Sequence, residues 1–198
     1  MEPTKRITNF ADLDLTKQYT YADYLTWWFD ERVELIKGFI RKMSPSASMS
    51  HQQISTRLTR LFANFLHGKK CQVFHAPFDV RLKRVVKDEE SITMVQPDLC
   101  IVCNLDYLEE RGCNGAPDLI IEILSPSNGK HDLVTKYQLY EEAGVAEYWL
   151  VYPFVKIVDV YHLQENKYVL YRKYSDDEVI EVKTLPGLMV ALNDIFEM

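Results

Sequence analysis

A single glutamate, Glu122, lies in the middle of an apolar run from Asp118 to Leu124. Such a run is typical of a β-strand that is buried on both faces. An ionised carboxylate is costly to bury unless a cation or hydrogen-bond donors compensate its charge. A second carboxylate, Asp98, opens another apolar run, residues 98–103. Two carboxylates on neighbouring strands suggest a metal site, for which the rest of the chain would be the scaffold.

The chemistry of such a pair depends on a nearby cationic side chain. Strand periodicity places Glu122 and Leu124 on one side of the strand. Nucleases of the PD-(D/E)XK type carry a lysine where this chain has Leu124, so that motif is interrupted here. Lys136 is a candidate replacement on the helix expected after the strand, where it shares a face with Asp132. If that helix packs against its parent strand, the Lys136 ammonium reaches the space beside Glu122.

The bulk composition is that of a globular protein with a substantial core. Of the 198 residues, 47% are hydrophobic and 12% aromatic, which excludes a disordered or fibrous chain. This length suits one domain, and we expect residues 1–198 to form one. The net charge of −6 does not favour nucleic-acid binding, whose footprint is usually basic. Basic residues do cluster locally, at 69–70 and 81–87.

The cysteines and the N-terminal segment bear on the compartment. Cys100 and Cys103 have the spacing of a zinc site, but positions i and i+3 of a strand point to opposite faces. We therefore expect these two, with Cys71 and Cys113, to be buried free thiols. Residues 1–6 lack an apolar signal core, and no run approaches the length that spans a membrane. These features favour a cytoplasmic protein without a membrane partner.

The first half of the chain is expected to supply two helices and several strands. Thr20 and Asp23 have the pattern of a capping box, which predicts a helix that ends near Arg32 and buries aromatic residues, Trp28 among them. Apolar residues at helical spacing predict a longer helix over 50–67. The remaining predictions are a hairpin over 34–43 that turns at Lys37-Gly38, a break at 44–46, strand pieces at 71–75 and 78–82 on either side of Pro77, and a charged loop over 83–91.

The second half is expected to alternate strands with one helix. A helix is predicted over 132–143, with Tyr140 on its inner face and Gly144 as its C-cap. It follows a turn over 125–129. The predicted strands cover 95–103, 118–124, 147–152, 156–163, 167–174 and 179–182, and a polar insertion over 104–116 separates the first two.

Several strings of residues resemble one known family. They are Val95-Gln96-Pro97-Asp98-Leu99, residues 117–127, the Asp132 and Lys136 pair, and residues 144–151. These strings closely resemble the Uma2 family, formerly grouped as a domain of unknown function and described as restriction endonucleases. Further matching strings are residues 34–38, 43–45, His51, 79–82 and 185–188, so the resemblance covers nearly the whole chain. One departure is Phe39 after Gly38, where many relatives carry an acid.

The resemblance implies an α/β fold with a restriction-endonuclease-like core, in which helices flank a mixed central β-sheet and β-hairpins are added. It implies Asp98 and Glu122 as metal ligands, Lys136 as the displaced lysine and Glu34 as a further acid near the site. With the carbonyl of Ile123, the two carboxylates would hold an oxygen-preferring cation, Mg²⁺ or Mn²⁺.

The implied activity is hydrolysis of phosphodiester bonds in DNA by a metal-dependent endonuclease. The metal would polarise a phosphodiester oxygen and lower the pKa of a bound water. Lys136 would orient or deprotonate that water, or stabilise charge at phosphorus, and Glu34 would hold a second metal or tune the first. The alternative is a catalytically inactive nuclease-fold protein that binds nucleic acid or a protein partner. A homodimer would suit cleavage of two strands, although no sequence feature fixes it.

Each candidate also has a purely structural interpretation. Glu122 and Lys136 could form a buried ion pair, and Asp98 could serve only the turn after Pro97. Lys136 could instead be a solvated helix lysine and Glu34 a surface charge. Two residues outside this set complete the candidates: His51 is expected to cap its helix or lie in the core, and Asp79 is a further acid between apolar residues.

Overall fold

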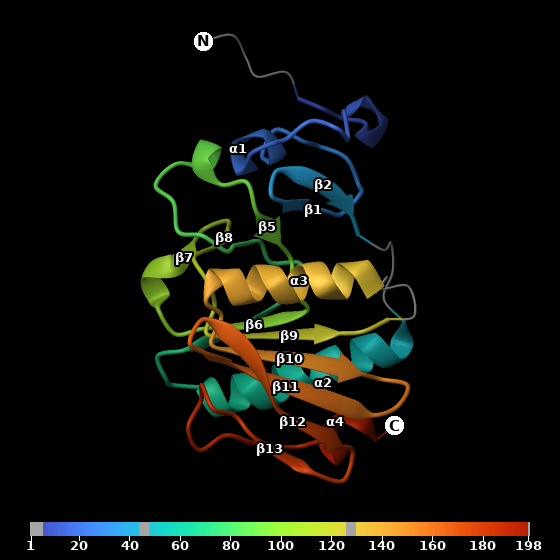
Figure 1. The fold of residues 1–198 in the computed structure, drawn as a ribbon, viewed down its shortest axis with the longest axis vertical. Helices are drawn as coiled ribbons and strands as arrows, with labels where there is room; N and C mark the ends of the chain where they lie inside the picture. The colour runs from blue at the N-terminus through green and yellow to red at the C-terminus, as the bar shows by residue number, and fades with distance from the viewer. Residues whose placement is uncertain (1–5, 44–47, 126–129, 198) are drawn as a thin grey trace.

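A six-stranded mixed sheet with a helix on each face forms the lower part of the computed structural model, which describes residues 6–43, 48–125 and 130–197 (Figure 1). The two middle strands, β9 and β10, run parallel, and every other neighbouring pair is antiparallel. In spatial order the strands are β12 (Lys167–Ser175), β11 (Ile157–Gln164), β10 (Glu147–Tyr152), β9 (Leu119–Ile123), β6 (Leu99–Val102) and β3 (Gln72–His75).

Two helices cover opposite faces of this sheet. The helix α2 (Met49–Leu66) packs Leu58 and Phe62 against the face that carries Trp149. The helix α3 (Lys130–Ala143) connects β9 to β10 and packs Tyr140 against the other face. Parallel neighbours need such a crossover, and it returns the helix over the strand that precedes it. All five residues of β9 are buried, as its apolar run predicted.

A second sheet lies on the α3 side of the first, toward the N-terminus (Figure 1). Its strands, in spatial order, are β2 (Phe39–Lys42), β1 (Val33–Ile36), β5 (Met94–Val95), β4 (Val80–Arg81), β8 (Gly112–Asn114) and β7 (Leu108–Glu109). The predicted hairpin over 34–43 is β1–β2. Lys37 and Gly38 both have positive φ, which is the requirement of a tight two-residue hairpin turn.

Short elements complete the described residues. They are the 3-10 helices η1 (Phe10–Asp12), η2 (Asp88–Glu90) and η3 (Leu105–Tyr107), the helices α1 (Tyr21–Tyr24) and α4 (Asn193–Phe196), and the hairpin of β13 (Val179–Glu181) with β14 (Met189–Ala191). The polar insertion over 104–116 thus contains η3, β7 and β8. The sequence patterns did not predict β14 or α4. Within the described ranges, no helix combines the length and apolarity that crossing a bilayer requires.

The strand predicted over 95–103 is two strands in two different sheets. Met94–Val95 belongs to the second sheet and Leu99–Val102 to the central one. The chain crosses between the sheets at Gln96-Pro97-Asp98, where Pro97 has no amide hydrogen to donate to a ladder. This crossing brings the two sheets together beside the β9 carboxylate, so the error in the prediction marks the place where the candidate site forms.

The helix predicted from Thr20 to Arg32 is only one turn long. Its capping box is present, with the Thr20 and Asp23 side chains each bonded to the other's backbone amide. Beyond Tyr24 the backbone instead meets the N-terminal segment, because the amide of Trp28 donates to the carbonyl of Ile7 at 2.7 Å. Trp28 is 61% exposed rather than buried, and the guanidinium of Arg6 lies over its ring.

The prediction of four free thiols is wrong for two of them. Cys71 and Cys103 form a disulfide, whereas Cys100 and Cys113 are free and buried. Antiparallel pairing of β3 with β6 places Gln72 opposite Val102, so the next residues outward also face each other, with 4.0 Å between their Cα atoms. Pairing between strands that are distant in sequence sets this contact, and spacing along the chain does not show it.

Most other element predictions are confirmed. The helices predicted over 50–67 and 132–143 are α2 and α3, and Gly144 ends α3 with a φ of +84°. The four strands predicted after Gly144 are β10 to β13. The predicted break at 44–46 lies outside the described residues, as does the turn over 125–129 apart from Ser125.

Candidate functional site

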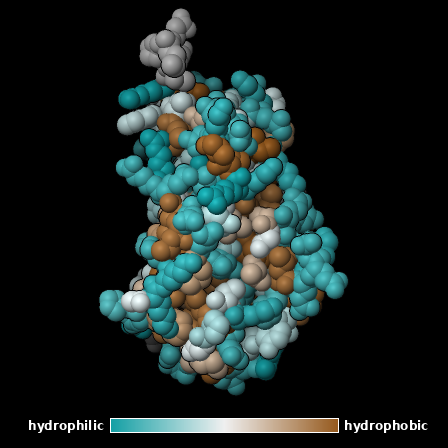
Figure 2. All heavy atoms as spheres, turned by 90° about the vertical axis from the view of Figure 1, so that its left-hand side faces the viewer, coloured by the Kyte–Doolittle hydropathy of each residue, from teal (hydrophilic) through white to brown (hydrophobic). Residues whose placement is uncertain are grey.

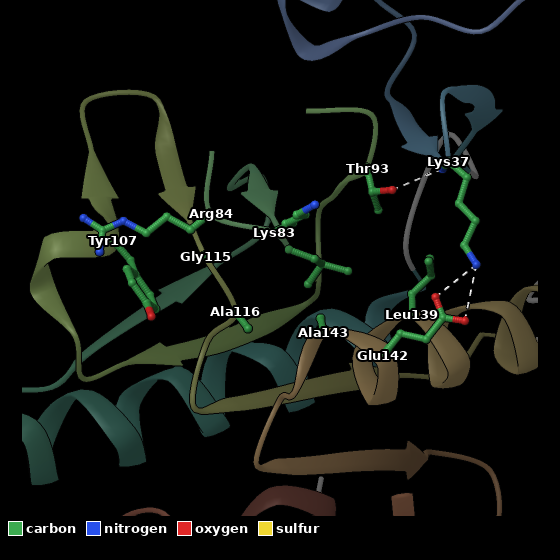
Figure 3. Close-up of a pocket in the computed structure, with 11 residues that line it drawn as sticks. Lys37, Lys83, Arg84, Thr93, Tyr107, Gly115, Ala116, Leu139, Glu142 and Ala143 are labelled. Atoms are coloured by element: carbon green, nitrogen blue, oxygen red, sulfur yellow. Dashed lines mark hydrogen bonds and ion pairs between the residues drawn. The ribbon is translucent and has the colours of Figure 1, made fainter. Parts of the chain in front are cut away.

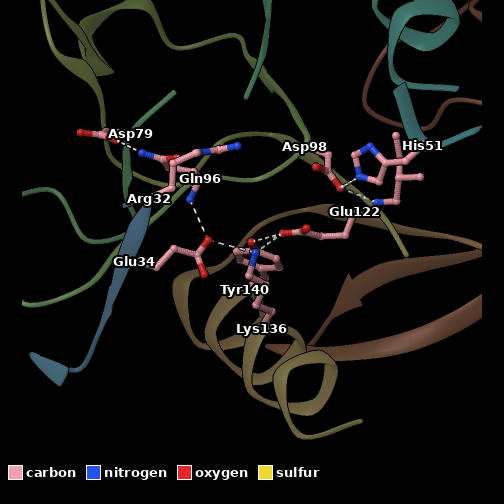
Figure 4. Close-up of polar contacts among 10 residues, drawn as sticks. Arg32, Glu34, His51, Asp79, Gln96, Asp98, Glu122, Lys136 and Tyr140 are labelled. Atoms are coloured by element: carbon pink, nitrogen blue, oxygen red, sulfur yellow. Dashed lines mark hydrogen bonds and ion pairs between the residues drawn. The ribbon is translucent and has the colours of Figure 1, made fainter. Parts of the chain in front are cut away.

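Three charged side chains from three different elements meet where the two sheets come together (Figure 4). The Nζ atom of Lys136, on α3, lies 3.0 Å from Oε1 of Glu34, on β1, and 3.0 Å from Oε1 of Glu122, on β9. The Lys136 side chain is only 15% exposed and both acids are buried. Lys136 is therefore not a solvated helix lysine, and Glu34 is not a surface charge.

The environment of Glu122 disfavours its ionised form. Burial raises the pKa of Glu122 to about 7; the charges of Asp98 and Glu34 act in the same direction, while Lys136 opposes them. The hydroxyl of Tyr140 donates to Glu122 Oε1 at 2.6 Å, and burial raises the pKa of Tyr140 well above its usual range. Tyr140 therefore remains a proton donor that fixes the position of this carboxylate.

Lys136 remains charged although it is buried. Burial alone would lower its pKa, but the two acids at 3.0 Å outweigh that effect and raise the pKa above the usual lysine value. A lysine with a raised pKa stays protonated at neutral pH, so it acts as a charged hydrogen-bond donor and is not available as a base.

Asp98 sits at the end of the sheet crossing and faces the end of β9. Its Oδ2 atom accepts a hydrogen bond of 2.7 Å from the amide of Ile123 and lies 3.1 Å from Nε2 of His51. The Asp98 side chain is 20% exposed, so the group reaches the surface of the site. In a β-strand the carbonyl of a residue leaves on the same edge as its amide, so the Ile123 carbonyl lies on the Asp98 side.

His51, in the first turn of α2, belongs to this site. The capping role falls to Ser48, whose Oγ accepts from the His51 amide at 3.2 Å. The imidazole contacts Asp98 and the main chain of Ile123, and its Nδ1 is buried without a partner among the described residues. Burial lowers the pKa of His51, but the hydrogen bond to Asp98 and the charges of Asp98 and Glu122 outweigh it, so the net shift is upward.

A chain of hydrogen bonds links Glu34 through Gln96 to Asp79 (Figure 4). The backbone amide of Gln96 donates to Glu34 Oε1 at 2.9 Å. The side-chain Nε2 of Gln96 donates to Asp79 Oδ1 at 2.8 Å. Arg32 donates to the side-chain oxygen of Gln96, and the hydroxyl of Tyr21 donates to Asp79. Asp79 therefore connects to the site through Gln96 and does not contact Glu122 or Asp98 within hydrogen-bonding distance.

The oxygen atoms present suit a hard divalent cation. Among the described residues no three or more His, Cys, Asp or Glu side chains are grouped to hold a metal ion. The candidate set is smaller: two carboxylates, Asp98 and Glu122, with the carbonyl of Ile123. Mg²⁺ commonly binds one or two carboxylates and keeps waters or substrate phosphate at its other positions. The negative charge of Asp98 already raises the pKa of Glu122, so a cation between them would relieve their repulsion.

In the metal-free protein, we expect the free energy of unfolding to decrease as pH rises from about 4.5 to about 7. Over that window the folded state holds a proton on Glu122 that the unfolded chain releases, because burial raises the folded pKa to about 7 from 4.5. The raised pKa of His51 acts in the same direction, but only above about pH 6.5, where the unfolded chain begins to release the histidine proton. The change should be on the order of 2 kcal/mol. Urea unfolding in EDTA at several pH values would measure it, and Glu122→Gln should flatten the curve; an equal slope in that variant would contradict the assignment.

A family model gives the strongest comparison with known proteins. The model described as "Uma2: Putative restriction endonuclease" matches residues 21–193. The chain belongs to the Uma2 family. All the site residues described above, from Tyr21 to Tyr140, lie within the matched part of the chain.

Two relatives extend the comparison. An uncharacterized protein of Synechocystis sp., slr1290, is 28% identical over 177 residues, which are 88% of this chain and 89% of the relative. A solved structure described as a putative nuclease belonging to DUF820, from Anabaena variabilis, superposes with a TM-score of 0.64 and covers 90% of this chain and 97% of its own, at 21% identity. The predicted fold class is confirmed: the Uma2 chain has a restriction-endonuclease-like α/β fold.

The sequence pointed to four residues that the structure brings into one place: Glu34, Asp98, Glu122 and Lys136. It missed the contact of His51 with Asp98, because the position of His51 at a helix start favoured a capping or core role. It also missed Gln96 and assigned Tyr140 only a core role. The available signal for Gln96 was a polar residue directly before Pro97 in a segment that is otherwise apolar and buried.

Proposed function

We propose that this Uma2 protein is a divalent-metal-dependent endonuclease that hydrolyses phosphodiester bonds in DNA. The observation that carries the proposal is Lys136, a buried and charged lysine held between Glu34 and Glu122. The family description and the fold of the nuclease-like neighbour support it. An ion pair needed only for stability could be replaced by apolar residues with little loss, and often with gain.

Asp98 and Glu122, with the Ile123 carbonyl, would hold Mg²⁺ or Mn²⁺. Bound there, the ion would polarise a phosphodiester oxygen and lower the pKa of an attacking water. Tyr140 fixes the carboxylate of Glu122 by its 2.6 Å hydrogen bond, and the Ile123 amide fixes that of Asp98 at 2.7 Å. Preorganised ligands of this kind need little rearrangement when the charge of the transition state develops.

Lys136 would act as a charged donor and not as a base. Its raised pKa keeps the ammonium protonated near neutral pH, so it stabilises negative charge on the phosphate or orients the water through a hydrogen bond. Glu34 is a positioning residue in this scheme: it contacts Lys136, and the amide of Gln96 holds its carboxylate in place.

A plasmid relaxation assay tests the proposal. The purified protein should convert supercoiled DNA into nicked or linear forms with Mg²⁺ or Mn²⁺, and EDTA should stop the reaction. Asp98→Asn should be inactive while its circular dichroism spectrum matches that of the native protein. The ratio of linear to nicked product would also report whether two copies cut together. Equal weak cleavage by native and Asp98→Asn protein would indicate a contaminant, and DNA binding without cleavage would favour the inactive alternative.

A further inference from the structure

A cavity of about 490 Å³ lies beside the C-terminal half of α3, away from the carboxylates (Figure 3). Leu139 and Glu142 of α3 form one wall, and the segment that follows β4 forms another with Lys83 and Arg84. Tyr107 of η3 lines the cavity on the same side as Arg84. This face of the molecule exposes hydrophobic side chains in small groups among hydrophilic ones, without one continuous apolar surface (Figure 2).

The cavity carries positive charge in a protein of net charge −6. Lys83 and Arg84 are exposed, and within the described part of the chain neither has an acidic partner at ion-pair distance. Lys37, on the opposite wall, pairs with Glu142 at 3.0 Å. Lys83 and Arg84 thus have no ion-pair partner in the described ranges, and Lys37 could exchange Glu142 for another anion. Such a group of cations is suited to binding a phosphate.

The cavity also presents an aromatic surface that the fold holds in place. The Arg84 guanidinium lies 5.3 Å from the centroid of the Tyr107 ring. Gly115 packs directly against that ring: a Cβ at this position would lie 2.6 Å from Cδ2 of Tyr107, and the φ of Gly115 is +148°. A side chain at position 115 would therefore displace the ring. Aromatic rings and guanidinium planes are the groups on which nucleobases stack.

Hydrogen bonds from Asn114 of β8 fix the segment that carries Lys83 and Arg84. The side chain of Asn114, which is buried, accepts from the amide of Val85 at 3.0 Å and donates to its carbonyl at 2.8 Å. The backbone amide and carbonyl of Val85, the residue after Arg84, are thus both held by Asn114. A binding surface on such a supported loop loses less conformational entropy when a ligand binds.

The cavity and the candidate metal site are both lined by residues of α3 and of the β1–β2 hairpin. Glu142 follows Lys136 by six residues on α3, which at 1.5 Å per residue is about 9 Å along the helix. Lys37 follows Glu34 by three residues on the β1–β2 hairpin. Phosphates of one strand recur about every 3.4 Å along a duplex axis, so this spacing corresponds to about two or three nucleotides.

We propose that this cavity binds a nucleotide of the DNA strand that flanks the cut, with its base against Tyr107 and Arg84 and its phosphate on Lys83. The inference rests on the proposed nuclease function for the identity of the strand. It adds a substrate-binding site to the proposed metal site, on a different part of α3.

Fluorescence anisotropy with a short labelled single-stranded DNA oligonucleotide, in EDTA and at low salt, tests the proposal without cleavage. The variant Lys83→Ala/Arg84→Ala should bind at least about tenfold more weakly. The slope of log affinity against log salt should become shallower by about 0.7, the value for the one phosphate contact that Lys83 makes to a single strand. Tyr107→Leu should weaken binding by about tenfold, from lost stacking. Glu142→Gln should strengthen binding severalfold, because it frees Lys37.

A control variant distinguishes binding in the cavity from nonspecific attraction of DNA to positive charge elsewhere on the surface. Arg60→Ala/Lys70→Ala removes the same two charges, from exposed positions on α2 and just before β3, and should leave affinity unchanged. A melting curve for each variant checks folding. Unchanged binding by both cavity variants would overturn the proposal, as would a free deoxynucleoside monophosphate that competes as tightly as the oligonucleotide.

The outcomes for the cavity and for cleavage are separable. Glu122→Ala should lose cleavage yet bind the oligonucleotide in EDTA as the native protein does. If the native protein cuts no DNA but the cavity variants still lose binding, the nuclease proposal fails and the nucleotide site stands. If cleavage is present and the cavity variants bind and cut normally, the nuclease proposal stands and the nucleotide site fails.

Discussion

Lys136→Met is expected to lower the free energy of unfolding by about 3–5 kcal/mol near pH 8, because it leaves Glu34 and Glu122 buried without their shared cation. Methionine has a similar length and no charge, so packing changes little. Cleavage should fall by about 10²–10³-fold, the loss typical when one preorganised donor to a transition state is removed. Urea unfolding and the plasmid assay measure the two effects.

Two further variants show that lost charge pairing is the cause. Adding Glu122→Gln to Lys136→Met removes one unpaired acid and should recover much of the lost stability, while cleavage should fall further and not recover. Lys37→Met breaks an ion pair of the same 3.0 Å length with Glu142, but that pair is exposed and the stability should barely change. A loss in Lys37→Met as large as in Lys136→Met would contradict the explanation. At about pH 5 the Lys136→Met deficit should shrink, because Glu122 then takes up a proton.

Glu122→Gln is expected to abolish both the stabilisation by metal and the cleavage. With Mn²⁺ at about a hundred times its dissociation constant, the native protein should gain about 2.7 kcal/mol. For a chain of this size that corresponds to a rise of about 5–10 °C in Tm. The amide that replaces the carboxylate could still accept the Tyr140 hydrogen bond but would not carry the charge that attracts the ion. Cleavage should fall by more than about a thousandfold, because metal stabilisation of the transition state amounts to several kcal/mol.

The control for this prediction is an acid outside the site. Glu178→Gln removes one negative charge near the end of β12, and should leave both the Mn²⁺-induced shift and cleavage as in the native protein. Asp98→Asn should behave as Glu122→Gln does. An unchanged Mn²⁺ shift in both Asp98→Asn and Glu122→Gln would place the ion elsewhere and remove these two residues as ligands.

The sequence predicted the parts of the site that local patterns encode. A fully apolar run with one acid indicated a buried strand around Glu122, and helical spacing indicated α2 and α3. Lys136 could be placed beside Glu122 because a helix between two parallel strands returns over the first of them. These inferences need only the periodicity of apolar residues and the short segment of chain that joins β9 to α3.

The missed contacts depend on pairing between distant segments. The hydrogen bond from Gln96 to Glu34 joins residues 62 positions apart, and the contact of His51 with Asp98 spans 47. The Cys71–Cys103 disulfide likewise follows from the register of β3 with β6. No local pattern specifies such registers, and the Pro97 crossing was hidden inside a run whose two halves look alike in hydropathy.

The crossing at residues 96–98 has a consequence for how the protein matures. Glu34 comes from one sheet and Glu122 from the other, so neither half of the chain alone presents the full set of charges. Under the proposed function, a nascent or partly unfolded chain therefore has no assembled site with which to cleave nucleic acid. The nuclease site then forms only when the two sheets dock against each other. A proteolytic cut that separated the sheets would abolish the activity.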